Sequence, residues 1–277
     1  MSAPNHSLHL GKLQGPLLVF GGPYSNLQAL QALREVANQK GIPADRIICT
    51  GDVVAYCAQP EESVQFIRDW GIHCISGNVE QQLASGQADC ACDFRSGGRC
   101  DTFSKQWYPF AQSQLSDTSL NWMRQLPEFI RFEYAKQSVF VLHGSYHHTS
   151  EFIFESTDWA IKAKNFEATQ SDVILAGHCG LPFSHQQAQQ IWLNAGVIGM
   201  PANDGTPNVW YLLLNDFPTF TYQHLPLSYD HTLANTLMQA KPLPQTYAKT
   251  LLTGIWDNCE ILPEDETKRQ GIPIILG

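Results

Sequence analysis

The sequence predicts an α/β fold, a four-layer α/β/β/α sandwich of two packed mixed sheets with helices on the outer faces. Two observations lead to this prediction. The first half of the chain alternates short apolar segments with amphipathic helical segments. The second half places short apolar segments close together, as hairpins do. Because no linker or internal repeat interrupts residues 1–277, we expect a single domain.

The first half is interpreted as two successive βαβ units. In each unit a short apolar strand precedes a helix whose apolar residues recur at helical spacing, and a glycine follows that helix. The polar residues 1–14 are expected to fray. Strands are predicted at residues 16–20, 47–49 and 72–76, and helices at residues 27–37 and 60–70.

The second half contains mainly strands. Two apolar or alternating runs flank Ala135-Lys136-Gln137 and predict a hairpin over residues 129–142. Further strands are predicted at residues 173–176, 183–185, 191–194, 209–214 and 219–224. Helices are predicted at residues 102–114, 117–125 and 158–169, and two C-terminal helices within residues 229–277, at 229–240 and 244–254.

Composition excludes several classes of partner. The formal net charge of −9 argues against binding to a nucleic-acid duplex, since phosphate neutralisation needs clustered Lys and Arg. The sequence has neither a signal-peptide pattern nor an apolar run of about 18 residues, so we expect a cytoplasmic protein that does not enter a membrane. A substrate, if there is one, is expected to be small. The oligomeric state is left open.

Residues 86–101 form a cysteine-rich insertion loop. Cys90, Cys92 and Cys100 could hold zinc or form one disulfide. A closed zinc site needs four ligands and usually a C-x2-C spacing, whereas this loop has three cysteines and a C-x-C spacing. We therefore favour a loop with free or reversibly oxidised thiols over a structural metal site.

Four polar side chains follow predicted strands closely: Asp52, Asn78, His143 and His178. Taken singly, the aspartate could close a turn or cap a helix, and each histidine could be a satisfied core residue. Polar residues at the carboxyl ends of parallel strands form the ligand crevice of open α/β folds, so the four are expected to converge. A carboxylate, an amide oxygen and two imidazoles suit a borderline divalent cation such as Zn, Mn or Fe.

With these motifs the chain resembles the calcineurin-like metallophosphoesterase family, in particular its small bacterial and archaeal branch. The family's motifs are D-x-H-x-N, G-D-x-V-x-Y, G-N-H-D/E, V-H-G-S, G-H-T-H-x-P and N-P-G-S-V-G. The matching segments, in the same order, are Ser25-Asn26-Leu27, Gly51-Asp52-Val53-Val54-Ala55-Tyr56, Gly77-Asn78-Val79-Glu80, Leu142-His143-Gly144-Ser145, Gly177-His178-Cys179-Gly180-Leu181-Pro182 and Asn194-Ala195-Gly196-Val197-Ile198-Gly199. The resemblance covers nearly the whole chain and implies the same four-layer fold.

The resemblance also implies that one of the family's two metal sites has lost all of its ligands except the bridging Asp52. Gly22 and Tyr24 stand where the family has the Asp and His of D-x-H, and Gly180 stands at the last His of G-H-T-H. The ligands of the other site correspond to the four strand-end residues, which are all present. One divalent cation is therefore expected, and a second would lack its ligands.

Catalysis is expected to be slow. Val79 stands where the family has a histidine that acts as catalytic acid, and Glu80 corresponds to the acid that orients that histidine. Loss of a general acid typically costs a factor of about 10²–10⁴ in rate. The resemblance thus implies a phosphoesterase of reduced activity on a small phosphate mono- or diester, with Asp52, Asn78 and His143 as catalytic residues. The alternative is a non-catalytic metal-binding or sensor module on the same fold.

Other groups could complete the second site or its pocket. The candidates are Gly22, Tyr24, Cys57, Glu80, His147, His148, Cys179 and the loop cysteines Cys90, Cys92 and Cys100. His148 and its neighbour His147 could equally lie in a solvated loop, and Cys179 could be small buried filler. The backbone amides of Gly21 and Gly22 could instead cradle an anion where the carboxylate is lost.

Overall fold

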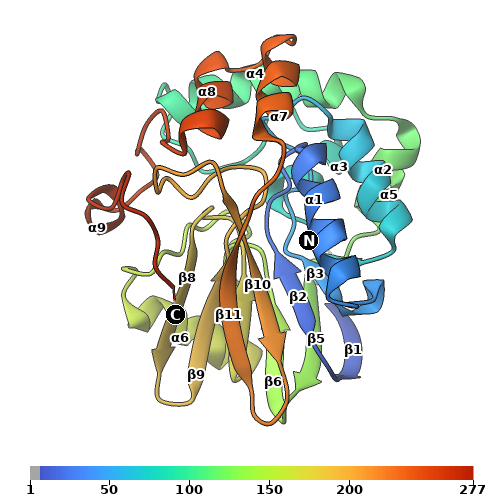
Figure 1. Cartoon of the computed structure of the whole chain (residues 1–277), viewed down its shortest axis with the longest axis vertical. Coiled ribbons are helices and arrows are strands. Elements are labelled where there is room, and N and C mark those ends of the chain that lie inside the picture. Colours follow the sequence, from blue (N-terminus) through green and yellow to red (C-terminus); the bar gives the residue numbers. More distant parts are fainter. Residues whose placement is uncertain (1–6, 277) are drawn as a thin grey trace.

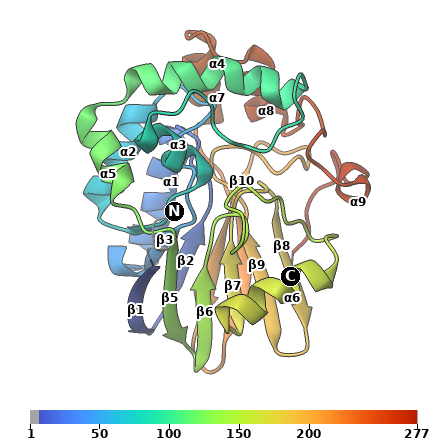
Figure 2. The same ribbon diagram turned by 180° about the vertical axis from the view of Figure 1, so that it is seen from behind.

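Two mixed β-sheets pack face to face between layers of helices in the computed structural model, which describes residues 7–276 (Figures 1 and 2). The six-stranded sheet has the order β1-β5-β6-β7-β9-β8, and the five-stranded sheet has the order β11-β10-β2-β3-β4. The predicted α/β/β/α sandwich is therefore confirmed.

The five-stranded sheet contains the βαβ units predicted for the first half. Its strands are β2 (Leu17–Phe20), β3 (Ile47–Cys49), β4 (His73–Cys74), β10 (Val209–Asn215) and β11 (Thr221–Leu227). The first three run parallel to one another, and β10 and β11 add an antiparallel hairpin at the other edge.

The six-stranded sheet contains the predicted hairpin and most of the close-set strands. Its members are β1 (Ser7–Leu13), β5 (Phe129–Tyr134), β6 (Gln137–Val141), β7 (Val173–Ala176), β8 (Pro182–Gln187) and β9 (Gln190–Ala195). Strands β6, β7 and β9 are parallel neighbours, so the carboxyl ends of β6 and β7 lie side by side.

Alternating side chains in each sheet divide the core into three parts. Leu17, Val19 and Ile48 face Val141 and Leu175 between the two sheets. Leu18 and Phe20, on the other face of β2, pack against the helices that cover the five-stranded sheet. The outer face of the six-stranded sheet packs against Phe166 of helix α6 and the C-terminal segment. This alternation is the period-2 pattern expected of strands buried on both faces.

The predicted helices lie close to their predicted positions. The helices of the structure are α1 (Leu27–Gln39), α2 (Pro60–Trp70), α3 (Asn78–Ser85), α4 (Arg99–Gln114), α5 (Asp117–Arg124), α6 (Trp159–Thr169), α7 (His231–Gln239), α8 (Gln245–Thr253) and α9 (Glu264–Thr267). A 3-10 turn, η1 (Ala44–Arg46), precedes β3. Helices α4, α7 and α8 lie at one end of the sandwich, whereas α6 covers the outer face of the six-stranded sheet (Figures 1 and 2).

None of the helices in the described part of the chain combines the length and the apolar character that crossing a membrane requires.

Four elements differ from the sequence prediction. Residues 7–13 were expected to fray but form β1, which pairs in parallel with β5; residues 1–6 of that segment lie outside the described residues. The pairing supplies backbone hydrogen bonds that local sequence does not reveal. The short helices α3 and α9 have no counterpart in the prediction, and α4 begins at Arg99, inside the predicted loop.

Packing between the two sheets is expected to dominate stability. Replacing Ile48, which is fully buried there, with alanine should lower the free energy of unfolding by about 2–5 kcal/mol. The matched control is Ile161→Ala on the outer surface of α6, where the side chain is 39% exposed and the change should stay within about 0.5 kcal/mol. Urea unfolding measures both, and equal losses would contradict the assignment of this core.

Candidate metal centre

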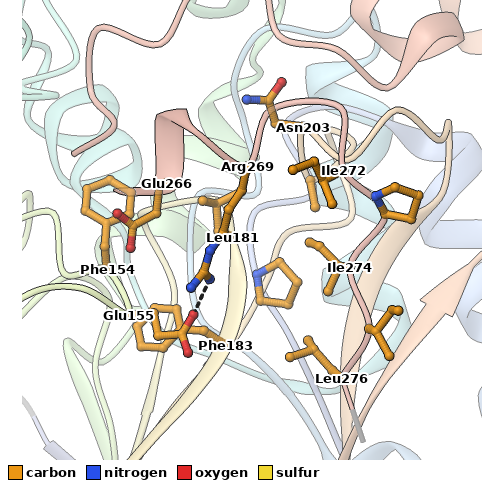
Figure 3. Close-up of a pocket in the computed structure, with 14 residues that line it drawn as sticks. Phe154, Glu155, Leu181, Phe183, Asn203, Glu266, Arg269, Ile272, Ile274 and Leu276 are labelled. Carbon is orange, nitrogen blue, oxygen red and sulfur yellow. Dashed lines mark hydrogen bonds and ion pairs between the residues drawn. The ribbon is translucent and has the colours of Figure 1, made fainter. Parts of the chain in front are cut away.

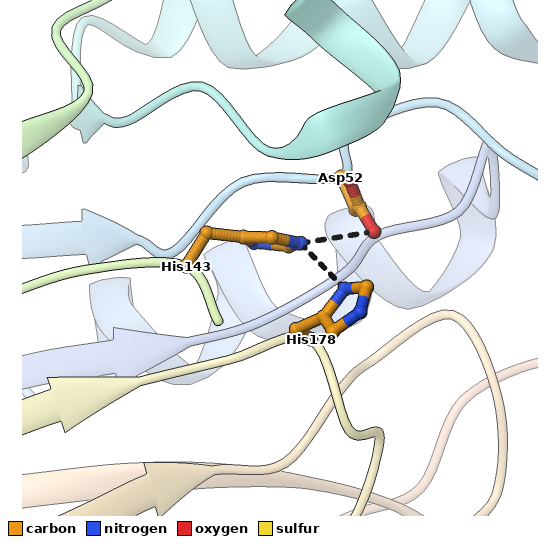
Figure 4. Close-up of side chains that lie close together, drawn as sticks. All are labelled: Asp52, His143 and His178. Carbon is orange, nitrogen blue, oxygen red and sulfur yellow. Dashed lines mark hydrogen bonds and ion pairs between the residues drawn. The ribbon is translucent and has the colours of Figure 1, made fainter. Parts of the chain in front are cut away.

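Four side chains from both sheets meet at the carboxyl ends of their strands. Asp52 and Asn78 follow β3 and β4 of the five-stranded sheet, whereas His143 and His178 follow β6 and β7 of the six-stranded sheet. Figure 4 shows Asp52, His143 and His178 turned toward one another. Their donor atoms lie within 4.8 Å of one another, and all three residues are buried. The structure thus brings the four predicted residues together, while their role as ligands stays a prediction.

His143 lies at the centre of this group. Its Nε2 is 3.1 Å from Asn78 Oδ1, 3.0 Å from His178 Nδ1 and 3.3 Å from Asp52 Oδ2. On the other side of the ring, Nδ1 is 2.6 Å from the Thr50 carbonyl and must donate its hydrogen there. The neutral imidazole therefore has its lone pair on Nε2, facing the other three groups.

The same reasoning assigns His178 and Asn78. His178 Nε2 is 2.9 Å from the Ser150 carbonyl and donates to it, so the lone pair lies on Nδ1. The Asn78 Nδ2 donates to the Cys90 carbonyl at 2.8 Å, which turns Oδ1 toward His143. Backbone carbonyls on the far side of a histidine ring are the usual partners of metal-binding histidines.

Four lone pairs, from Asp52, Asn78, His143 and His178, therefore face a common point. Two lone pairs 3.0–3.3 Å apart repel unless a proton or a cation lies between them. Donor atoms that bind one ion at about 2.0–2.2 Å lie roughly 3 Å from one another, which matches this spacing. The donor set and its spacing fit a single divalent cation.

Asp52, His143 and His178 shift one another's pKa values through their charges. Burial opposes a charge on His143, but the Asp52 carboxylate outweighs burial and raises the pKa of His143. Burial likewise opposes the charge on Asp52, and His143 outweighs it and lowers the pKa of Asp52. Burial and the nearby His143 lower the pKa of His178 to about 3, so its Nδ1 stays an acceptor. A proton on His143 and a cation would compete for one position, so cation binding should release a proton.

Glu80 positions two of the segments that build this site. Its buried carboxylate accepts hydrogen bonds from the amides of Asp52 at 2.8 Å, Gly77 at 2.9 Å and Val54 at 3.3 Å. Burial and the neighbouring Asp52 raise the pKa of Glu80 to about 7. In the family that the chain resembles the corresponding acid orients a histidine, which Val79 replaces in this chain, and Glu80 instead holds the loop after β3 against the start of α3.

The backbone around the site adopts conformations that ordinary residues avoid. Asp52 has φ of 55° and His178 has φ of 62°, both in the left-handed region. Such residues cost about 1–3 kcal/mol each and cluster at functional sites. Glycines also permit a close approach here, since a Cβ on Gly77 would lie 2.2 Å from Asp52 Oδ1.

Beside Asp52 and His178 lies a small cavity of about 40 Å³, where the second metal site was expected to lack its ligands. Tyr24 and Gly180, which stand at lost ligand positions of that site, line it together with Val79. The rest of its wall is largely aromatic or apolar and includes Tyr56, Phe94, Trp107, Phe152 and Met200. A second cation is therefore not favoured by the groups around this cavity.

The other candidate residues occupy different environments. Gly22 lies under the Tyr24 ring, because a Cβ there would be 2.5 Å from that ring. The Gly21 amide donates to the Gly196 carbonyl, so an anion cradle at this turn is not supported. The Cys57 thiol contacts the Gly199 carbonyl away from the cavity, and the His148 side chain is exposed.

Cys179 does line the cavity, but its sulfur is held elsewhere. It contacts the Leu181 carbonyl at 3.7 Å and accepts from Asn194 Nδ2 at 3.3 Å. Burial raises the pKa of this thiol to about 12. This environment agrees with the interpretation of Cys179 as a small buried side chain that fills space in the core.

Several contributors to the site were not identified from the sequence. Thr50 and Ser150 act through backbone carbonyls, which leave no trace in residue type. Phe152 stacks on the His178 ring with centroids 4.3 Å apart, yet an isolated phenylalanine in a loop gives no such signal. Cys90 and Cys92, for which free or reversibly oxidised thiols were favoured over a structural metal site, form a disulfide in the structure.

A larger pocket of about 400 Å³ lies apart from these residues (Figure 3). Its walls are mainly apolar and include Phe154, Leu181 and Phe183 with the C-terminal residues 272–276. An ion pair between Arg269 and Glu155 lies at its edge. None of the four convergent side chains lines this pocket.

Comparison with known proteins gives consistent matches. Residues 25–216 match the model of a calcineurin-like phosphoesterase superfamily domain. An uncharacterized protein of Methanocaldococcus jannaschii is 23% identical over 256 residues, which cover 86% of this chain and 98% of that protein.

Two solved structures share the fold. A metallophosphoesterase from Sphaerobacter thermophilus has a TM-score of 0.70 at 21% identity, with 88% of this chain and 100% of that chain covered. A hypothetical protein from Pyrococcus horikoshii has a TM-score of 0.72 at 17% identity, with 87% and 99% covered. At these identities the structures establish the fold and leave the chemistry to the site itself.

Gly77→Ala tests the close approach at Asp52. The added Cβ would lie 2.2 Å from Asp52 Oδ1, so the carboxylate must move and the affinity for a divalent cation should fall by about tenfold or more. Gly86→Ala, at the other end of α3, is the matched control. A Cβ at residue 86 meets no atom within 4 Å. This variant should therefore lose only about 1–2 kcal/mol of unfolding free energy, because alanine is strained at the φ of 70°. Isothermal titration with Zn²⁺ or Mn²⁺ compares the two variants, and equal affinities would contradict this geometry.

His224 predicts a pH dependence of stability. It donates to the Asn194 carbonyl at 2.7 Å, and burial lowers its pKa from 6.5 to about 4. Between these pH values the unfolded state binds a proton that the folded state does not, so stability should fall as the pH falls, by up to roughly 3 kcal/mol. Urea unfolding across this range should show a weaker decline for His224→Gln, which keeps a donor but does not titrate. An unchanged decline in that variant would refute the assignment.

Proposed function

Because the chain belongs to the calcineurin-like phosphoesterase superfamily, we propose that it is a divergent metal-dependent phosphoesterase that hydrolyses a small phosphate mono- or diester with one retained cation. The observation that carries the proposal is the convergence of four lone pairs at the carboxyl ends of strands from both sheets. Asp52, Asn78, His143 and His178 would hold Zn, Mn or Fe, since their mixed nitrogen and oxygen donors suit borderline divalent ions.

A bound divalent cation supplies a Lewis acid that polarises a phosphoryl oxygen and lowers the pKa of water. The protein supplies the position of that cation through Glu80 and the carbonyls of Thr50 and Ser150. It also keeps His178 neutral, because burial lowers the pKa of that imidazole to about 3.

Reduced activity is part of the proposal. Val79, an apolar residue, lines the cavity where leaving-group protonation would be needed. Tyr24 is a poor substitute, because burial and the Asp52 charge raise the pKa of its phenol well above the usual range. Without a general acid the rate falls by a factor of about 10²–10⁴.

The partner is proposed to be a small phosphorylated molecule in the cytoplasm. The net charge of −9 disfavours a nucleic-acid duplex. Six cysteines in the described part of the chain are free thiols, which suits a reducing compartment.

The alternative function is a non-catalytic metal-binding or sensor module. The closure of the site favours it, because Asn78, His143 and His178 are at most 7% exposed and the adjoining cavity measures only about 40 Å³. A cavity of this size is too small for a phosphate ester without some rearrangement of its lining.

Metal analysis and phosphatase assays distinguish the two functions. We expect close to one bound cation per chain and slow hydrolysis of p-nitrophenyl phosphate or bis(p-nitrophenyl) phosphate in the presence of Zn, Mn or Fe. Asp52→Ala and His143→Ala should lose both metal and hydrolysis. His148→Ala, an exposed histidine outside the site, is the control and should retain both. Bound metal without turnover would support the module, and a metal-free wild-type protein would refute both functions.

A further inference from the structure

The loop beside the cation site contacts one proposed ligand, Asn78, directly and a second, His178, through Phe152. We call residues 86–98 the roof loop. Asn78 Nδ2 donates to the Cys90 carbonyl at 2.8 Å and contacts Cys92 Sγ at 3.4 Å. Phe94 stacks on Phe152 with centroids 6.4 Å apart, and Phe152 in turn stacks on His178. The state of the roof loop therefore acts directly on the site.

The sulfur of Cys92 lies next to the proposed ligands. Cys92 lines the small cavity together with Asp52 and His178, and the Asn78 amide contacts the Cys92 sulfur through Nδ2 at 3.4 Å and His143 Nε2 through Oδ1 at 3.1 Å. Thiolate sulfur is a strong ligand for zinc. In the disulfide with Cys90, however, this sulfur is not available as a thiolate.

The disulfide borders a surface groove, with Cys90 2% and Cys92 8% exposed. A surface groove of about 350 Å³ runs along the other side of the roof loop, lined by Cys90 and Cys92 with Asp89 and Asp93 among its walls. This groove is the side from which a small reductant would approach the largely buried pair.

The end of the loop is anchored independently. Arg99 pairs with Asp257 at 2.6 Å, and the Glu260 carboxylate accepts from the amides of Arg99 and Cys100. The Cys100 thiol contacts Asn258 instead of the other cysteines. Breaking the disulfide would therefore free the segment around Cys92 while α4 stays in place.

We propose that Cys90 and Cys92 form a redox-controlled extension of the cation site, in which reduction makes Cys92 an additional, thiolate ligand of the bound cation. The inference rests on the proposed cation site formed by Asp52, Asn78, His143 and His178. In the oxidised form the site has nitrogen and oxygen donors only. In the reduced form sulfur joins from the cavity side, which favours zinc over manganese and occupies the space through which a substrate would approach.

The chemical step is thiol–disulfide exchange with a dithiol reductant. A thiolate of the reductant attacks one sulfur of the pair, breaks the Cys90–Cys92 bond and releases the other sulfur as a thiolate. The second thiol of the reductant then closes its own disulfide and releases the remaining cysteine. Two electrons and two protons pass from the reductant to the protein, and the proton of Cys92 leaves when the cation binds.

Cobalt substitution tests this proposal without measuring activity. Purified protein is prepared oxidised, or reduced with a phosphine that is then removed by gel filtration, and each form is titrated with Co²⁺. Visible d–d bands report occupancy of the site, whereas a near-ultraviolet charge-transfer band reports a cobalt–sulfur bond. We expect d–d bands in both forms and the charge-transfer band in the reduced form only. Competition with Zn²⁺ should show tighter binding on reduction, on the order of 10–100-fold.

Single-cysteine variants identify the sulfur. Cys90→Ser should show the charge-transfer band without any reductant, because its Cys92 has no disulfide partner. Cys92→Ser should never show it, and Cys100→Ser is the control that should behave as the wild type. The proposal is overturned if reduced wild type and Cys90→Ser give d–d bands alone, or if the band persists in Cys92→Ser. Absence of cobalt bands from every form would instead overturn the cation site itself, and this inference with it.

Discussion

The arrangement of this protein's site depends on where two imidazole rings place their hydrogens. Thr50 and Ser150 offer backbone carbonyls to the outer nitrogens of His143 and His178, so the inner nitrogens are left with lone pairs. The Asn78 amide is oriented in the same way by the Cys90 carbonyl. Together with the Asp52 carboxylate, these groups face one point with acceptors only, and a cation or a proton on His143 is needed to relieve their repulsion.

This arrangement requires both sheets. Each sheet contributes two of the four groups, and the hydrogen bond from His143 to the Thr50 carbonyl joins one sheet to the other. Buried packing between the sheets sets their separation, and Glu80 holds the loop after β3 against α3. The left-handed backbone of Asp52 and His178 is maintained by this surrounding structure. Stability and site geometry are therefore closely coupled in this protein.

The space next to the proposed cation position differs from the surroundings that a second cation would need. Where a second cation would need carboxylate and imidazole ligands, this chain has aromatic rings and a cavity of about 40 Å³. The roof loop closes that space and places a disulfide beside Asn78. The aromatic lining and the neighbouring disulfide motivate the two proposals, a slow phosphoesterase with one cation and a redox-controlled ligand.

The sequence by itself determined the layered fold and the candidate residues. Apolar runs of strand length ending at Asp52, Asn78, His143 and His178 predicted both, because hydrophobic periodicity and strand ends are local properties. Only the tertiary structure decided the rest. Edge strand β1 exists because β5 offers it a partner, and His148, Cys57 and Gly22 are separated from the cavity by chain direction and packing. The lone pairs are directed by backbone carbonyls, which every residue has, so no residue type in the sequence could mark them.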